Sequence, residues 1–270
     1  MTEQAEPAEF GDEYTRFLGY ESERTSETTA SSWVALRPDL LDGDGALAPV
    51  VLAFLVDSTP GVVCGAAALP DWVITTDLHM QVTGRRVRGN LRADATLVHA
   101  SRLGVLAEVT VVDEGDAGRV VATGSVNHAR IPLKEPINVP VMPVGVRYRS
   151  PAGGPPGDRL AREIVFRAVG SDGEAETAAT ALTTNPLGIM HGSVTTTLSI
   201  TAAARCAPDG WQVAEAMVRF SNSVRKGPAR ARPTVVHADD AGRVVKVDLR
   251  DTSYPGKIAV HSVVRLVPPR

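Results

Sequence analysis

A five-residue motif occurs twice in this 270-residue chain, and it constrains the fold more than any other feature of the sequence. Residues 96–100 read Thr-Leu-Val-His-Ala, and residues 234–238 read Thr-Val-Val-His-Ala, an offset of 138 positions. The same offset aligns Asp113 with Asp251, and each aspartate ends a segment of strand-like character. Turn-forming residues that recur between such segments are typical of turns between strands. We therefore expect two copies of one strand-rich unit.

Two segments delimit these copies. Residues 1–27 are rich in acidic side chains, and we interpret them as an acidic N-terminal tail. Residues 133–157 are dense in proline and glycine, which break regular structure and often mark a boundary, so we interpret them as a linker. This division predicts a first unit over residues 28–132 and a second unit over residues 158–270.

Each unit is predicted to combine one buried helix with antiparallel strands, which is an α+β arrangement. Residues 46–59 form the first helix candidate, because Pro49 suits a first helical turn and the apolar run is long enough to be buried all round. Residues 191–204 favour a strand by propensity, but the repeat places a helix there, and we follow the repeat. Strands are expected near residues 62–69, 72–82, 91–100, 103–113 and 118–130, and near residues 161–169, 175–183, 212–221, 231–238, 243–250 and 257–267.

The segment NPLGIMHGSVTTTLSITA, which begins at Asn185, resembles the hotdog-fold acyl-CoA thioesterases of the PaaI-like type. The motif of that family has an asparagine, a His-Gly-Gly sequence six residues later, and an acidic residue nine residues after the histidine. Asn185, His191 and Gly192 match this motif. Ser193 replaces the second glycine, and Ile200 occupies the acidic position. The second unit therefore has the histidine of the motif without its acid.

The first unit supplies the missing acid. When the two helices are aligned by their apolar pattern, His191 falls against Ala48 and Ile200 falls against Asp57, an offset of 143 positions. The resemblance implies a double hotdog, in which the acid of one helix faces the Asn and His-Gly end of the other. It therefore implies an acyl-CoA thioesterase with one composite site and one inactive pseudo-symmetric site.

The resemblance also assigns roles in thioester hydrolysis. Asp57 would activate water or attack as the nucleophile, and burial would raise the pKa of its carboxyl. The backbone N–H of Gly192 and the positive end of its helix would stabilise the oxyanion. Asn185 would hold the substrate carbonyl or the water, and His191 would orient this region. Without the resemblance, Asp57 is a residue that ends a helix before a turn, and His191 is a structural histidine.

Further residues complete the expected site. Similar proteins often have a serine or threonine on the strand after the acidic helix, and we prefer Thr75 to Thr76 for this position. Two basic clusters follow the long strand of each unit, and such side chains bind the phosphates of coenzyme A well, although solvated loops carry similar charges. The residues assigned to substrate binding are Arg85, Arg86, Arg88, Arg225 and Lys226.

Three other functions are compatible with the sequence: a non-catalytic acyl-CoA-binding protein, an (R)-specific enoyl-CoA hydratase, and a hotdog scaffold without a ligand. The hydratase signature is similar to Asp-x-Asn-Pro-aliphatic-His. Here four residues separate Pro186 from His191 instead of one, which argues against the hydratase.

Composition limits the partners and the compartment. A net charge of −3 argues against non-specific nucleic-acid binding, and no uninterrupted apolar run approaches the roughly 20 residues that span a membrane. Only two cysteines, Cys64 and Cys206, are present, and no secretory signal is visible. We therefore expect a cytoplasmic enzyme of fatty acid metabolism, with no metal and no cofactor beyond the coenzyme A of its substrate. By analogy with hotdog assemblies, we expect a homodimer or homotrimer.

Overall fold

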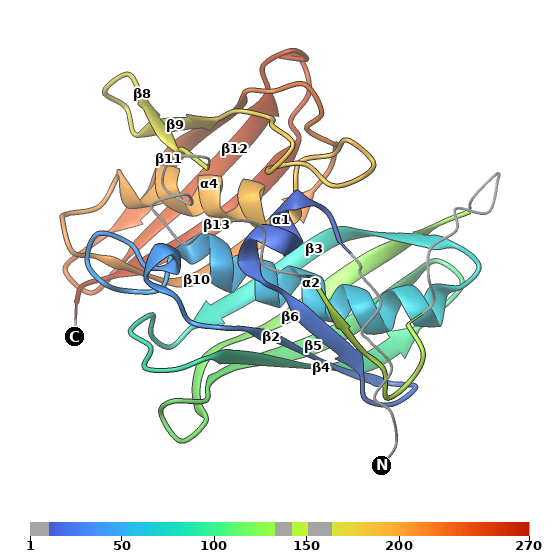
Figure 1. Cartoon of the computed structure of the whole chain (residues 1–270). Coiled ribbons are helices and arrows are strands. Elements are labelled where there is room, and N and C mark those ends of the chain that lie inside the picture. The colour runs from blue at the N-terminus through green and yellow to red at the C-terminus, as the bar shows by residue number, and fades with distance from the viewer. Residues whose placement is uncertain (1–10, 133–141, 151–163, 270) are drawn as a thin grey trace.

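In each half of the molecule an apolar helix lies against one face of an antiparallel sheet (Figure 1). The computed structural model describes residues 11–132, 142–150 and 164–269. The first unit contains α1 (Glu13–Leu18), β1 (Glu21–Arg24), β2 (Thr29–Val34), the 3-10 turn η1 (Pro38–Leu40), α2 (Pro49–Ala68), β3 (Trp72–Val82), β4 (Leu91–Ala100), β5 (Gly104–Asp113), β6 (Arg119–Ile131) and β7 (Arg147–Arg149). The second unit contains β8 (Arg167–Val169), β9 (Glu174–Thr177), α4 (Gly192–Ala204), β10 (Gln212–Phe220), β11 (Ala229–Ala238), β12 (Arg243–Asp251) and β13 (Val260–Val267).

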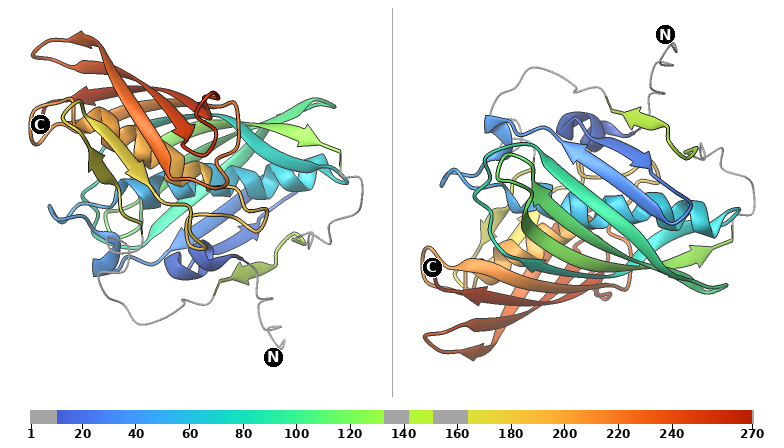
Figure 2. Two further views of the ribbon diagram at one scale, coloured as in Figure 1. Left: turned by 90° about the horizontal axis from the view of Figure 1, so that it is seen from above. Right: turned by 90° about the horizontal axis from the view of Figure 1, so that it is seen from below.

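The two half-sheets join edge to edge into one sheet of 13 strands, in the order β7-β1-β2-β4-β5-β6-β3-β10-β13-β12-β11-β9-β8. At the junction, β3 and β10 pair antiparallel, with Asp77 opposite Arg219 and Gln81 opposite Glu215. The Arg219 guanidinium donates to Asp77 across this pair at 2.9 Å. The helices α2 and α4 contact each other, and the halves coloured blue-green and orange-red stay distinct in both views of Figure 2. The α+β class is thereby confirmed.

The repeated motif marks the same irregularity in both units. In β4 the pairing with β5 shifts by a β-bulge between Leu97 and His99. In β11 the pairing with β12 shifts between Val235 and His237, which are the same two positions at the offset of 138. A bulge inserts one unpaired residue and increases the local twist of the sheet. The repeated five-residue motif therefore marks a β-bulge that both half-sheets share.

Helix α2 is longer than the sequence indicates. It continues through Pro60 to Ala68, so the predicted strand over residues 62–69 is wrong. Pro60 and Gly61 are typical of a turn, but burial of Val63 and Cys64 in the core favours continuation of the helix. By length and composition α2 would be able to span a membrane, yet 61% of its apolar window is buried inside the fold, as expected of a core helix.

Helix α4 confirms the repeat against local propensity. Three of its hydroxyls are satisfied within the helix, because each donates to a carbonyl three or four residues earlier. Thr195 donates to Gly192 at 3.0 Å, Thr197 to Ser193 at 2.8 Å, and Ser199 to Thr195 at 3.1 Å. Ser193 Oγ and Thr196 Oγ1 are buried without a hydrogen-bond partner among the described residues, so the buried helix forms at the cost of two unpaired hydroxyls.

The predicted acidic tail is folded wherever the structure describes it. From Gly11 onward the chain forms α1 and then β1, which pairs with β2 at the edge of the sheet. Tyr14 and Leu18 are completely buried, and the Tyr20 hydroxyl lies 2.8 Å from Ser32 Oγ. Apolar residues dispersed among the acidic ones thus attach this segment to the first unit, and the interpretation as a tail is wrong for residues 11–27.

The predicted linker also contributes to the sheet. Its residues 142–150 include β7, which pairs with β1, and the Arg147 guanidinium lies 3.7 Å from the centroid of the Trp33 ring. Residues 133–141 and 151–157 of the linker lie outside the described residues. The strands predicted near 161–169 and 175–183 shorten to β8 and β9, and residues 161–163 also lie outside the described part.

Close packing of α2 on β6 predicts a specific sensitivity at Gly124. A Cβ at this position would lie 2.7 Å from both the His79 carbonyl oxygen and Val56 Cγ1. We expect Gly124→Ala to lower the free energy of unfolding in urea by about 1–3 kcal/mol, because overpacking forces the helix or strand to move. The control Gly43→Ala, where nothing lies within 4 Å, should change it by less than about 0.5 kcal/mol. Equal effects at the two positions would contradict this packing.

Candidate functional site

The centre of the candidate site is a hydrogen bond between a helix and a strand of the first unit. Thr75 Oγ1 on β3 donates to Asp57 Oδ1 on α2 at 2.9 Å. The neighbouring Thr76 instead donates to the Asn127 carbonyl at 3.2 Å. A β-bulge in β3 between Thr75 and Asp77 aims these successive side chains, so the structure brings Thr75 and not Thr76 to Asp57.

The second unit meets this pair at the beginning of α4. A Cβ on Gly192 would lie 2.5 Å from Asp57 Oδ2, so the absence of a side chain lets the carboxylate approach the helix. The backbone N–H of Ser193 donates to the Asp57 carboxylate. The first N–H groups of a helix have no partner inside it, and they favour negative charge. Residues predicted from both units are therefore in contact at one place.

Burial raises the pKa of the Asp57 carboxyl above its usual value. The hydrogen bond from Thr75, the charge of His191 and the Ser193 N–H each lower the pKa but do not offset the loss of water. Asp57 nevertheless keeps partial exposure. The carboxylate is accordingly a stronger base than an exposed aspartate.

His191 faces a residue that the sequence analysis missed. His191 Nε2 lies 2.9 Å from Asp12 Oδ2, within ion-pair distance, although the angle falls outside hydrogen-bond geometry. Asp12 begins α1 and accepts a hydrogen bond from the Thr15 N–H at 2.9 Å. Burial acts to raise the pKa of Asp12, but His191 and Thr15 together outweigh it and lower that pKa. Asp12 is a residue type that often begins a helix, with its carboxylate accepting the N–H three residues later. This pattern was the signal by which the sequence could have identified Asp12.

Aromatic rings enclose the other side of the imidazole. The Tyr14 ring lies 4.8 Å from the His191 ring, and the Phe54 ring lies 6.5 Å from it, as measured between centroids. The Tyr14 hydroxyl donates to the Val50 carbonyl at 3.3 Å, and burial raises the pKa of this hydroxyl. The segment around α1 therefore contributes both a charge and an apolar wall to the position of His191.

Asn185 has a structural role in the loop before α4. Its Oδ1 accepts the N–H groups of Leu187 and Ile189 at 3.0 and 3.1 Å. Asp42 does the same in the first unit, where its Oδ1 accepts the N–H groups of Asp44 and Ala46. Asn185 and Asp42 are related by the offset of 143. The structure does not bring Asn185 to Asp57, so the expected role in holding the substrate carbonyl has no support in the contacts.

Comparison with known proteins shows what this chain and its fold are similar to. Residues 3–125 match a family model described as the acyl-CoA thioesterase C-terminal domain. An acyl-ACP thioesterase from Bacteroides thetaiotaomicron has a TM-score of 0.58 at 12% identity, over 89% of this chain and 99% of that one. The tesB protein of Mycobacterium avium subsp. paratuberculosis has a TM-score of 0.59 at 9% identity, over 92% and 96%. A hotdog-fold protein from Alicyclobacillus acidocaldarius has 0.54 at 8% identity, over 89% and 93%.

The chain is a double-hotdog protein, and residues 3–125 are similar to the acyl-CoA thioesterase C-terminal domain. None of the curated proteins matches its sequence. At the low identities to the solved structures, their likeness concerns the fold, and it extends over both units. The predicted double hotdog and the predicted resemblance to acyl-CoA thioesterases are confirmed.

The pseudo-symmetric position, at the start of α2, lacks the histidine, the glycine and the acid of the site described above. Ala48 precedes α2 where His191 precedes α4, and Pro49 occupies the first helical position where α4 has Gly192. Proline has no N–H to donate. Ile200, at the position of Asp57, is buried and apolar. The double hotdog therefore has polar chemistry at one helix start only.

The five predicted phosphate-binding residues differ in their surroundings. Arg85 donates to Asp42 Oδ2 at 2.6 Å and to the Leu47 carbonyl at 2.7 Å. Its guanidinium therefore stabilises the loop before α2, which contradicts the prediction that Arg85 binds phosphate. Arg88 lies 3.8 Å from Asp116 and is otherwise exposed. The exposed residues Arg86, Arg225 and Lys226 have no carboxylate within ion-pair distance among the described residues. In this same part of the chain, no group of three His, Cys, Asp or Glu side chains could hold a metal ion.

The contact between Gly192 and Asp57 predicts a coupled effect on stability. We expect Gly192→Ala to lower the free energy of unfolding by about 1–3 kcal/mol, because its Cβ would displace the carboxylate. In the Asp57→Ala background the same change should cost less, with a coupling energy of about 0.5–3 kcal/mol from urea unfolding of all four proteins. Additive effects on the free energy of unfolding would mean that a Cβ at position 192 does not contact the Asp57 carboxylate.

Proposed function

We propose that this protein hydrolyses acyl-CoA thioesters at one composite site between its two units. The observation that carries this proposal is the meeting of the Asp57–Thr75 pair of the first unit with the start of α4 in the second. A thioester is already a reactive acyl donor, so its hydrolysis needs a positioned water, a base and donors for the developing oxyanion. All three requirements can be met here, and the reaction needs no further cofactor.

Asp57 acts as the general base in this mechanism. A base is most effective when its pKa approaches the working pH, and burial moves the pKa of Asp57 in that direction. Thr75 holds Oδ1, which leaves Oδ2 to accept the proton of a water that attacks the thioester carbon. The carboxylic acid formed in this step can then protonate the departing thiolate.

The start of α4 supplies the oxyanion donors. The Gly192 N–H donates to no acceptor among the described residues, and Ser193 directs its N–H toward Asp57. When the thioester oxygen becomes negative, the Gly192 N–H and the helix dipole stabilise it. Loss of one such donor typically reduces the rate about 10²–10³-fold. Gly192 is required because any Cβ would occupy the space between donor and carboxylate.

His191 and Asp12 complete the electrostatics. The His191 imidazole lies 2.9 Å from Asp12 and close enough to Asp57 to lower the pKa of that carboxyl. We assign His191 to orienting the thioester and to balancing the charge of the base. Asp12 acts through His191 and is a positioning residue.

Replacing the base should separate activity from stability. We expect Asp57→Asn to reduce kcat/KM for acyl-CoA thioesters at least about 10²-fold, measured by thiol release from acetyl through long-chain and phenylacetyl substrates. The same variant should have a higher Tm than wild type at pH 7, because the raised pKa means that ionised Asp57 costs stability above its folded pKa. This gain should disappear as the pH falls below the ordinary aspartate value, where both states are protonated.

The control for this variant is Asp77→Asn, which removes a carboxylate on β3 that pairs with Arg219 at the surface. It should leave kcat/KM within about twofold of wild type. Retention of activity in Asp57→Asn would refute the proposed base. A single turnover in ¹⁸O-labelled water tests the mechanism as well: label should enter the fatty acid directly, and label in the Asp57 carboxylate would show attack by the aspartate.

The threonine pair predicts the direction of a pH shift. The hydrogen bond from Thr75 lowers the pKa of Asp57, so Thr75→Val should raise that pKa further. The base is lost when it is protonated, and the acid limb of the kcat/KM profile should therefore move to higher pH. Thr76→Val, which removes only a bond to the Asn127 carbonyl, should leave the limb unchanged. A shift in Thr76→Val alone would contradict the orientation of β3.

A further inference from the structure

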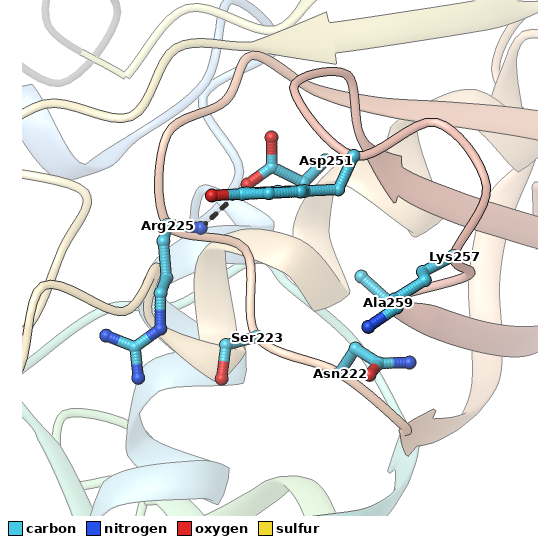
Figure 3. Close-up of a pocket in the computed structure, with 7 residues that line it drawn as sticks. Asn222, Ser223, Arg225, Asp251, Lys257 and Ala259 are labelled. Carbon is cyan, nitrogen blue, oxygen red and sulfur yellow. Dashed lines mark hydrogen bonds between the residues drawn. The ribbon is translucent and has the colours of Figure 1, made fainter.

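A polar pocket of about 230 Å³ opens beside the proposed site, between the β10–β11 and β12–β13 loops (Figure 3). Figure 3 shows Arg225 and Lys257 on opposite sides of this pocket, with Ser223 and Asn222 between them. Tyr254 also lines it. The mechanism proposed above uses none of these five side chains.

The loop that forms one wall leads directly to the reaction centre. Phe220, the last residue of β10, would contact a Cβ on Gly192 at 3.4 Å. Further along the loop, the Val224 carbonyl accepts the N–H of Met190 at 2.9 Å, one residue before His191. A ligand that occupies the pocket therefore lies along the same loop as the start of α4.

The pocket has a positive charge that the chain does not neutralise. Asp251 also lines it, but its carboxylate is buried and accepts the backbone N–H groups of Arg225, Lys226 and Ser253 at 2.9, 3.0 and 2.9 Å. Within residues 11–132, 142–150 and 164–269, no carboxylate lies at ion-pair distance from the side chains of Arg225, Lys226 or Lys257. The Arg225 guanidinium donates to the Leu187 carbonyl at 3.0 Å, which leaves its charge, like those of Lys226 and Lys257, without a carboxylate partner among the described residues.

The first unit has the same framework with its charge balanced. Asp113, the counterpart of Asp251, accepts the N–H groups of Arg88 and Gly89 at 2.7 and 2.9 Å. At the offset of 138, Tyr254 corresponds to Asp116 and Lys257 corresponds to Arg119. Asp116 Oδ2 accepts a hydrogen bond from Arg119 at 2.6 Å and its Oδ1 lies 3.8 Å from Arg88.

The two units have therefore diverged at this position. Where the first unit has an acidic residue between two arginines, the second has an aromatic ring between Arg225 and Lys257. The Lys226 ammonium lies 5.8 Å from the centroid of that ring. Aromatic faces stack on nucleobases, and basic side chains bind phosphates, so the second arrangement fits a phosphorylated nucleoside.

We propose that this pocket binds the 3′-phosphorylated ADP portion of coenzyme A, with Arg225 and Lys257 on its phosphates and Tyr254 against its adenine. The proposal rests on the thioesterase function above and deepens it, because it names the carrier of the acyl group. An acyl carrier protein presents the same phosphopantetheine arm without an adenosine. The enzyme therefore selects coenzyme A thioesters over acyl groups on a carrier protein.

The test compares an acyl-CoA, its 3′-dephospho form, the matching S-acyl pantetheine and the matching acyl carrier protein as substrates. We expect Lys257→Met to raise KM for acyl-CoA about tenfold to hundredfold with little change in kcat, and to leave KM for S-acyl pantetheine unchanged. Tyr254→Asp, which introduces the acidic residue of the first unit, should have the same effect. The exposed Lys246 on β12 provides the matched control Lys246→Met, which should match wild type for every substrate.

A second readout does not depend on turnover. Adenosine 3′,5′-bisphosphate should bind wild type and Lys246→Met in calorimetry, and it should bind Lys257→Met at least about tenfold more weakly. Equal KM values for acyl-CoA and S-acyl pantetheine, or preference for the carrier protein, would overturn the pocket and leave the thioesterase intact. Binding of the bisphosphate without hydrolysis of any thioester would support the pocket and overturn the proposed reaction.

Discussion

The rest of the site depends on one close contact, between the Asp57 carboxylate and the first turn of α4. A buried carboxylate is costly unless donors surround it, and Asp57 obtains them from Thr75 of its own unit and Ser193 of the other. This arrangement requires a residue without a side chain at Gly192, and it requires the two helices to lie in contact. The helix contact in turn depends on the β3–β10 junction, which fixes how the half-sheets meet. The position of the Asp57 carboxylate at the start of α4 therefore depends on the register of the sheet.

Duplication explains why the two halves can differ so much where they meet. A symmetric pair would bury an aspartate on each helix, at twice the desolvation cost. This chain keeps one, and the opposite position carries Ile200 with Pro49 at the helix start. The same asymmetry extends to the loops, where Asp116 balances the arginines of the first unit and Tyr254 leaves the cations of the second free. Each unit could lose polar groups that its partner supplied.

The sequence predicted the features that repeat and missed those that occur once. The two offsets placed α4 as a helix against its β propensity and placed Asp57 opposite the start of α4. Asp12 has no counterpart in a repeat, and its acidic surroundings suggested a tail. Pro60 is typical of a turn, so the sequence did not predict the second half of α2. Burial outweighed local propensity there. The choice between Thr75 and Thr76 depended on a bulge that no pattern in the sequence reveals. By contrast, the loop role of Asn185 was visible in principle, since Asp42 and Gly45 stand 143 positions before Asn185 and Gly188.

Two carboxylates near one imidazole have opposite environments, and in the proposed mechanism this difference assigns their roles. Asp12 caps a helix and faces His191, so its pKa is lowered and it remains a fixed negative charge. Asp57 is enclosed by the contact of the two units, so its pKa is raised and it can exchange a proton. Pairs of acids whose pKa values are driven apart in this way are typical of sites where one group reacts and the other supports it. The N-terminal segment that carries Asp12 is accordingly part of the proposed site, and the burial of Tyr14 attaches it to the core of the fold.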